Sequence, residues 1–161
     1  TGADMVLWDG ACIVHEEYKA LELKKLINKY DCDVLVHPES PRSVINLADV
    51  VGSTTKLIEA SIVSNKKYIV VATESGIIYQ MKKRSPDKIF LEAPTAGEGA
   101  SCESCGKCPW MKLNKLDNLL EIFDNKQNEI HLSNDVIKKA QKSIQRMVNF
   151  KNKEFNNKKV S

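Results

Sequence analysis

The sequence lacks long apolar stretches and is poor in aromatic residues, which make up 6% of it. No stretch approaches the roughly 20 apolar residues in a row that a membrane-spanning helix needs. The first residues also lack the basic region followed by an apolar run that is typical of a secretory signal. We therefore expect a soluble protein that is located in the cytoplasm and has no membrane partner.

A large excess of charge is absent as well, because the formal net charge is only +3. Residues 151–161 contain four lysines and one glutamate, so this Lys- and Asn-rich end accounts for all of the net positive charge. A protein that binds the phosphates of nucleic acid usually presents a basic face. We expect no nucleic-acid partner, and we expect residues 151–161 to form a disordered tail.

The length of 161 residues and the apolar content of 42% fit one domain with an ordinary core. The first residue is Thr1 rather than methionine, and residues 5–8 already have the apolar character of a strand. The sequence therefore predicts that the chain begins inside a larger fold.

The chain has an odd number of cysteines, and they are unevenly distributed along it. Five cysteines without a secretory signal argue against a disulfide scaffold. Three of them, Cys102, Cys105 and Cys108, lie within seven residues, a spacing similar to that of the first three cluster ligands of a bacterial ferredoxin. A structural zinc site needs four ligands, of which Cys12 and His15 could supply two. The spacing leaves open a cluster, a zinc site, a redox-active pair and a coincidence without function.

Short apolar runs alternate along the chain with stretches of helical periodicity. A run such as 34–36, which has no polar residue, is typical of a strand buried on both faces of a parallel sheet. The alternation predicts an α/β protein, a three-layer αβα sandwich with a short parallel sheet and right-handed crossovers. Ser40 is expected to cap one helix, with Pro41 as its first residue. The expected strands are 5–8, 34–36, 49–51, 68–72 and 88–91, and the expected helices are 16–29, 41–47, 55–64 and 77–81.

The alternation ends at residues 93–100, which are small and rich in glycine and predict a mobile loop leading to the cysteine cluster. Pro109 can start a helix that continues to Phe123. An edge strand is expected at 130–132, followed by an amphipathic helix over 134–150.

Polar residues follow four of the expected strands. The loops at the carboxyl ends of parallel strands open on one edge of the sheet, where α/β proteins bind their ligands. The sequence therefore predicts an active site at this edge, although strand-end loops are polar in any α/β protein. The four segments are Gly10-Ala11-Cys12, His37-Pro38-Glu39, Gly52-Ser53-Thr54 and Glu74-Ser75-Gly76.

His37 and Glu39 lie two residues apart beyond a buried strand, and Pro38 stiffens the link between them. Alternate residues of an extended segment point the same way, so both side chains can face one ligand. The alternative is structural: His37 ends the strand, and Glu39 pairs with Arg42 near the start of the next helix.

Gly52, Ser53 and Thr54 precede a helix. Unpaired backbone N–H groups and hydroxyls at such a position can bind a phosphate or a carboxylate. The alternative is N-capping by Ser53, Thr54 or Thr55, which explains these residues adequately by itself.

Taken in order, these segments resemble the quinolinate synthase family from about residue 1 to residue 114. No single segment is specific enough, but their joint order and spacing are. The last of them contains the sequence Cys-Pro-Trp-Met beginning at Cys108. The matching segments are 8–16, 36–39, 48–54, 71–77, 92–97 and 102–114.

The resemblance implies an enzyme of three similar αβα domains around a central [4Fe–4S] cluster, to which each domain contributes one cysteine. It implies that Cys12 and Cys108 are metal ligands and that the third ligand lies upstream of Thr1. The domains would then be the end of the preceding domain in 1–14, the C-terminal αβα domain in 15–150 with a cluster loop at 93–109, and the tail at 151–161.

The resemblance also implies the chemistry. The family condenses iminoaspartate with dihydroxyacetone phosphate to quinolinate in de novo NAD biosynthesis, with loss of phosphate and two waters, and uses the open iron of the cluster as a Lewis acid. His37, Pro38 and Glu39 would line the substrate, with Glu39 as general base or acid and His37 orienting or protonating it. Ser53 and Thr54 would hold a substrate anion.

Two further expectations follow from the resemblance: a functional link to L-aspartate oxidase, and no turnover by this chain alone, because residues of the other domains are missing. The resemblance gives Cys102 and Cys105 no ligand role, so these two thiols could form a redox-sensitive pair. The alternative function is a zinc-binding or scaffold module that uses Cys102, Cys105 and Cys108.

Overall fold

The computed structural model describes residues 4, 6, 8–95, 106–125 and 129–157. The chain divides into two units, Thr1–Leu113 and Asn114–Ser161. The predicted domain of residues 15–150 and the predicted tail of residues 151–161 stay predictions. The assignment of residues 1–14 to a preceding domain stays a prediction.

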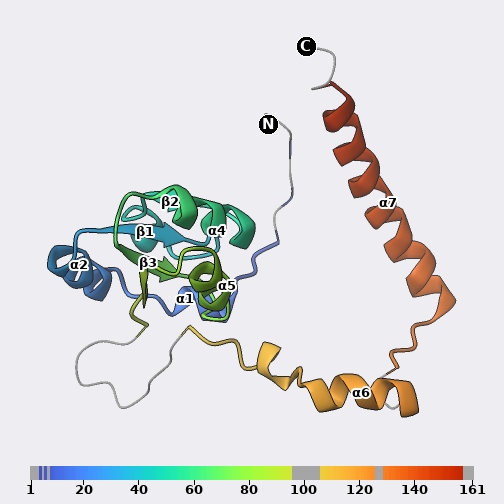
Figure 1. The fold of residues 1–161 in the computed structure, drawn as a ribbon. Coiled ribbons are helices and arrows are strands. Elements are labelled where there is room, and N and C mark those ends of the chain that lie inside the picture. Colours follow the sequence, from blue (N-terminus) through green and yellow to red (C-terminus); the bar gives the residue numbers. More distant parts are fainter. Residues whose placement is uncertain (1–3, 5, 7, 96–105, 126–128, 158–161) are drawn as a thin grey trace. The chain divides into compact units, whose positions relative to one another are not determined.

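The first unit is built around a sheet of four parallel strands in the order β2-β1-β3-β4 (Figure 1). The central pair is β1 and β3, which align Val34 with Val70 and Val36 with Ala72. All three pairings are parallel, as the continuous apolar runs of the sequence predict. The strands are β1 (Cys32–Val36), β2 (Val50–Val51), β3 (Tyr68–Ala72) and β4 (Ile89–Glu92).

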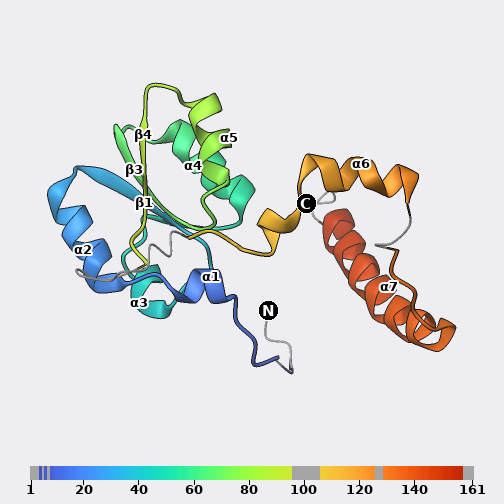
Figure 2. The ribbon, with the colours of Figure 1, turned by 90° about the horizontal axis from the view of Figure 1, so that it is seen from below.

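Helices cover both faces of this sheet (Figure 2). Because successive side chains of a strand point to opposite faces, Val34 and Val36 pack in one core cluster and Leu35 packs in another. The first cluster includes Leu23 of α2 (Ala20–Lys29) and Val44 of α3 (Arg42–Ile45). The second lies under α4 (Thr54–Val63) and α5 (Ile77–Arg84). The predicted three-layer αβα sandwich is confirmed.

The two central strands lead to opposite faces. From β1 the chain enters α3 on one face, whereas from β3 it enters α5 on the other. Such a reversal is a topological switch point, where the departing loops leave a crevice at the carboxyl ends of the strands. The residues just beyond Val36 and Ala72 therefore lie at the place where α/β folds generally bind ligands.

The helix predicted over 16–29 is two helices, α1 (Ile13–Glu16) and α2. Between them Tyr18 is buried, and the Lys19 N–H donates a hydrogen bond to the carbonyl of Pro94 at 3.0 Å. This tertiary contact uses a backbone donor that an uninterrupted helix would bond internally, so the chain turns here.

Two other predictions about the N-terminal half were wrong in detail. Val6 and Trp8, from the expected strand 5–8, belong to no strand and are exposed; a strand needs a neighbouring strand to complete its hydrogen bonds. The N-cap of α3 is Pro41, not Ser40. The buried hydroxyl of Ser40 has no hydrogen-bond partner among the described residues.

The region after the cysteine cluster also differs from its prediction. The helix expected from Pro109 to Phe123 is a 3₁₀ turn, η1 (Met111–Leu113), followed by α6 (Leu116–Asp124). Residues 130–132 form no strand. Helix α7 (Asn134–Asn157) continues beyond the predicted end at Phe150 into the expected tail.

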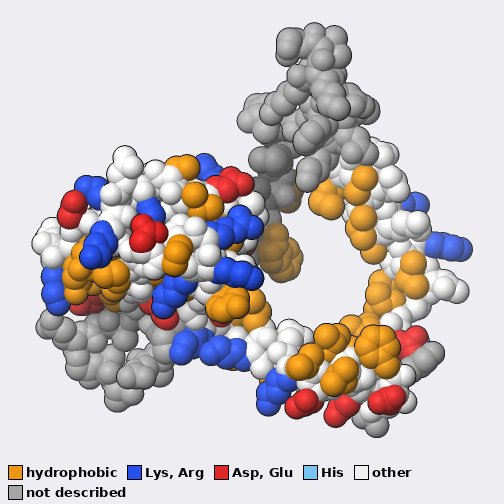
Figure 3. All heavy atoms as spheres, viewed as in Figure 1, with side chains coloured by type: hydrophobic (Ala, Val, Ile, Leu, Met, Phe, Trp, Pro, Cys, Tyr) orange, Lys and Arg blue, Asp and Glu red, His pale blue; other side chains and the backbone are white. Residues whose placement is uncertain are grey.

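The second unit consists of α6 and α7. Apolar side chains gather along α6, with acidic side chains beside them (Figure 3); Leu116, Leu119 and Phe123 are all exposed. Spacings of three and four residues place these side chains on one face. No helix in the described part of the chain is both long and apolar enough to cross a membrane.

The packing of the core predicts how much a cavity would lower the free energy of unfolding. Leu57 of α4 is fully buried in the second cluster, so Leu57→Ala should lower the free energy of unfolding by about 2–5 kcal/mol. The matched control is Leu21→Ala, because Leu21 is 69% exposed and should cost less than about 0.5 kcal/mol. Urea unfolding followed by circular dichroism measures both; equal costs would contradict the described packing.

Candidate functional site

His37 is the first residue beyond β1. Its N–H donates to the carbonyl of Ala72 at 3.0 Å, which extends the β1–β3 ladder by one bond. Gly52 likewise donates to the carbonyl of Val36. These bonds fix the backbone of His37 at the carboxyl edge of the sheet, which is where the sequence predicts it.

Three side chains meet at this edge of the sheet. The rings of His15 and His37 stack at 4.3 Å between centroids with 13° between their planes. Glu39 Oε2 lies 3.2 Å from Nδ1 of His15 and 3.7 Å from Nδ1 of His37. The carboxylate of Glu39 therefore lies beside two imidazoles, His15 and His37. That His37 and Glu39 face one ligand stays a prediction.

His15 contacts Thr73, the residue that directly follows β3. Its Nε2 lies 3.0 Å from Thr73 Oγ1. The hydroxyl of Tyr18 donates to the carbonyl of the same Thr73 at 2.5 Å, and burial followed by the charge of Glu92 raises the Tyr18 pKa, so this donor keeps its proton. The segment of α1 is thereby attached to the sheet edge.

Burial sets the charge state of His15. Its pKa lies below the ordinary value of 6.5, first because burial disfavours the charged ring and second because His37 is close, while Glu39 opposes both effects. A neutral imidazole keeps one nitrogen with a lone pair. Although Nδ1 is 3.2 Å from Glu39, it has no partner in hydrogen-bond geometry among the described residues.

Cys12 lies next to this cluster. It precedes α1, and its carbonyl accepts bonds from the N–H groups of His15 and Glu16 at 3.0 Å each. The ligand atoms of Cys12, His15 and Glu39 lie within 4.8 Å of one another. A hollow of about 390 Å³ adjoins them, lined by Trp8, Gly10, Ala11, Cys12 and Glu39.

Cys108 approaches the same edge through Gly106. The carbonyl of Gly106 accepts from the N–H of Ser75 at 3.0 Å. Gly106 has a φ of 52°, and a Cβ on it would lie 2.6 Å from the Tyr18 hydroxyl. Glycine is needed here because other residues are strained in this conformation and no side chain fits. Two residues span at most about 7 Å, so Cys108 follows close to the end of β3.

Cys12 and Cys108 suit an iron–sulfur cluster by their chemistry. Both thiols are free and partly buried, and thiolate is the ligand type that such clusters use. Small residues, Gly10 and Ala11, line the hollow beside Cys12 and leave room there. Among the described residues Cys108 is not a member of the close group formed by Cys12, His15 and Glu39, and its ligand role stays a prediction.

Ser53 has the capping role that sequence analysis offered as the alternative. It is the N-cap of α4, and its hydroxyl accepts from the Lys56 N–H at 3.4 Å. Thr54 is the first residue of α4 and is exposed. Anion binding by Ser53 and Thr54 stays a prediction, whereas Cys102 and Cys105 lie outside the described residues.

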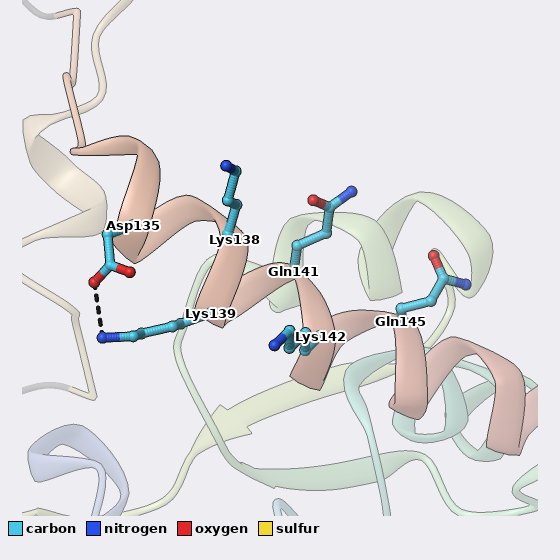
Figure 4. A pocket seen from close by; sticks show the side chains of 6 residues that line it. All are labelled: Asp135, Lys138, Lys139, Gln141, Lys142 and Gln145. Carbon is cyan, nitrogen blue, oxygen red and sulfur yellow. Dashed lines mark ion pairs between the residues drawn. The ribbon is translucent and has the colours of Figure 1, made fainter.

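A second hollow lies on α7, where one ion pair joins Lys139 to Asp135 at 2.7 Å (Figure 4). All six lining residues belong to this one helix, and Figure 4 shows their side chains spread along it rather than converging. It is the gap between solvated side chains of a surface helix and not a site.

Sequence analysis missed Thr73 and Tyr18. Thr73 directly precedes the strand-end segment Glu74-Ser75-Gly76, and this position could have suggested a role at the edge. Tyr18 gave no such signal, because its apolar spacing within a helical pattern predicts packing only. Thr73 contacts His15, 58 residues away, and Tyr18 contacts Thr73, 55 residues away, and lies against Gly106.

The first unit is an α/β fold with thiol, imidazole and carboxylate groups at its switch point. It therefore belongs to the class of α/β proteins whose candidate site for a metal or a small polar ligand lies at the carboxyl ends of the strands. Residues 1–149 match the family model described as quinolinate synthetase A protein, NadA. The chain therefore belongs to the quinolinate synthetase A family. This is a family of enzymes of NAD biosynthesis that act on small molecules and generally bind a [4Fe–4S] cluster.

The buried state of His15 predicts how it titrates. In the metal-free chain, its NMR titration midpoint should lie below 6.5, the ordinary pKa of histidine. Since the unfolded ring takes up a proton near that pH and the folded ring resists it, the free energy of unfolding should fall as the pH drops below about 6.5. His15→Gln assigns the resonance and should remove this component. A midpoint above 6.5 would contradict the described burial.

Proposed function

We propose that this chain forms part of the active site of a quinolinate synthase that condenses iminoaspartate with dihydroxyacetone phosphate, with loss of phosphate and two waters. The observation that carries the proposal is the meeting of His15, His37 and Glu39 beside Cys12 at the switch point. Family membership supports quinolinate synthesis in general.

Cys12 and Cys108 are the proposed ligands of a [4Fe–4S] cluster. They come from separate segments: Cys12 precedes α1, and Cys108 follows two residues after Gly106, whose carbonyl accepts a hydrogen bond from Ser75 just beyond β3. When bound through three cysteines, the cluster supplies one open iron, a Lewis acid that can hold a carboxylate or hydroxyl and assist its loss as water. The third cysteine would come from outside residues 1–161, so we expect no turnover from this chain alone.

Glu39 is the proposed general base or acid. Its side chain is 56% exposed and lines the hollow next to Cys12, so it can reach a substrate there. The two imidazoles beside its carboxylate can hold or return the proton that Glu39 moves. His37 lies on the more exposed side of the stacked pair, with 20% of its side chain exposed against 10% for His15, which suits a role in orienting the substrate.

The remaining contacts of the substrate are proposed by resemblance. Pro38 would line it between His37 and Glu39, and Ser53 and Thr54 would hold a carboxylate or phosphate. Their exposure at the start of α4 leaves the hydroxyl of Thr54 accessible. A cytoplasmic location and a functional link to L-aspartate oxidase, as a partner in the same biosynthesis, complete the proposal.

The ligand assignment is tested by iron analysis of the full-length natural protein that contains this chain, purified without oxygen. It should hold about four irons per chain, and Cys12→Ala and Cys108→Ala should each lose most of this iron. The matched control is Cys32→Ala, because Cys32 begins β1 at the opposite end of the sheet. Loss of iron in Cys105→Ala but not in Cys12→Ala or Cys108→Ala would show that the assignment is wrong.

The role of Glu39 is tested by Glu39→Gln in the same cluster-loaded protein. Removal of a general acid–base group should lower kcat about 100-fold or more while iron content stays unchanged. The control is Glu59→Gln, an exposed carboxylate on α4, which should leave quinolinate formation unaltered. Full activity of Glu39→Gln would exclude the proposed role.

A further inference from the structure

Cys12, His15 and Glu39 bring three different metal-binding groups together. A thiol, an imidazole and a carboxylate have their ligand atoms within 4.8 Å of one another. These are the three side-chain types that zinc takes as ligands. Neither the iron–sulfur assignment nor the proposed acid–base chemistry gives His15 a metal to bind.

His15 supplies a second observation that points to a ligand. It is 7% exposed, and its Nδ1 has no hydrogen-bond partner among the described residues. This nitrogen faces Glu39 at 3.2 Å. The contact with Glu39 is an ion pair without full hydrogen-bond geometry, and a metal ion between the two groups would bind both of them.

The other nitrogen of the same ring is already fixed. Nε2 lies 3.0 Å from the hydroxyl of Thr73. A metal-binding histidine almost always engages its second nitrogen in this way, since the contact fixes the ring orientation and the tautomer. In the tautomer that carries its proton on Nε2 and donates it to Thr73, Nδ1 has a lone pair that a metal could bind in place of the present contact with Glu39.

We propose that, in the absence of a cluster, Cys12, His15 and Glu39 bind a single zinc ion. Three protein ligands leave a fourth tetrahedral position open, and the hollow of about 390 Å³ lined by Cys12 and Glu39 provides space for a water or another small ligand there.

The geometry requires only small adjustments. With zinc bonds of about 2.0–2.3 Å, neighbouring ligand atoms of a tetrahedral site lie about 3.3–3.7 Å apart. The pair of His15 and Glu39 is at 3.2 Å, and the whole group is within 4.8 Å. Glu39 is more than half exposed, so its side chain can rotate toward a metal without disturbing the core.

Zinc and the cluster would exclude each other, because both need the sulfur of Cys12. Zinc would also occupy Glu39, which could then not serve as a general base. Zinc would therefore slow the assembly of the cluster and keep an enzyme that contains this chain in an inactive form. The zinc site depends only on side chains of this chain, so it can be tested independently of the proposed function.

The test uses the 161-residue chain, purified in reductant, stripped with EDTA and carrying Cys102→Ser, Cys105→Ser and Cys108→Ser. This background removes the competing cysteine triplet. Titration with zinc against a coloured chelator should give one zinc per chain, and Co²⁺ should give the charge-transfer absorption of a thiolate ligand. Zinc binding that disappears in this background would assign the metal to the triplet and overturn the proposal.

Single variants in this background test each ligand. Cys12→Ser, His15→Ala and Glu39→Gln should each weaken zinc binding at least about 100-fold, because loss of an outer contact alone costs about 10–100-fold. The matched controls, Cys32→Ser and His131→Ala, remove a thiol at the far end of β1 and an exposed imidazole of the second unit, and should change nothing.

Glu39→Gln keeps the test valid if His15→Ala disturbs folding, because Glu39 is exposed and its replacement is isosteric. Equal zinc affinity in Glu39→Gln and in the background would overturn the three-ligand site. The iron content of the anaerobic full-length protein is a separate measurement. A failed zinc titration would therefore not contradict the assignment of the cluster ligands. Absence of the cluster would likewise not contradict the zinc site.

Discussion

The parallel pairing of β1 with β3 is the constraint on which the site depends. The hydrogen-bond ladder between these strands continues by one bond beyond their ends, from the N–H of His37 to the carbonyl of Ala72. From this point the chain leaves β1 for one face of the sheet and β3 for the other. His37 and Thr73 therefore directly follow the two central strands at the carboxyl edge of the sheet, and the backbone position of His37 is set by a hydrogen bond rather than by a flexible side chain.

The N-terminal segment completes the site because it is attached to the same crevice at three points. His15 contacts the hydroxyl of Thr73, Tyr18 donates to the carbonyl of Thr73, and Lys19 donates to the carbonyl of Pro94. These contacts break the helix expected over 16–29 and, in return, bring Cys12 beside Glu39. Competition between local helix propensity and long-range hydrogen bonds is resolved here in favour of the long-range bonds.

Most of the sheet could be predicted from the sequence, because strands buried on both faces must be continuously apolar. The run 68–72 coincides with β3, and α4 begins one residue before its predicted start. Val6 and Trp8 of the expected strand 5–8 belong to no strand, and neither do residues 130–132, since an apolar run becomes a strand only where a neighbouring strand can pair with it. The helix expected from Pro109 to Phe123 failed at its start, where the chain forms a 3₁₀ turn instead.

By itself, the sequence determined the fold class, the edge of the sheet that bears the site and, through the order of its motifs, the family. Only the tertiary structure decided that His15 stacks on His37 and that Thr73 and Tyr18 hold His15 in place. The physical reason is the distance along the chain: periodicity and spacing report on neighbours within a helix or strand. His15 and Thr73, by contrast, are 58 residues apart and meet only after the sheet has formed.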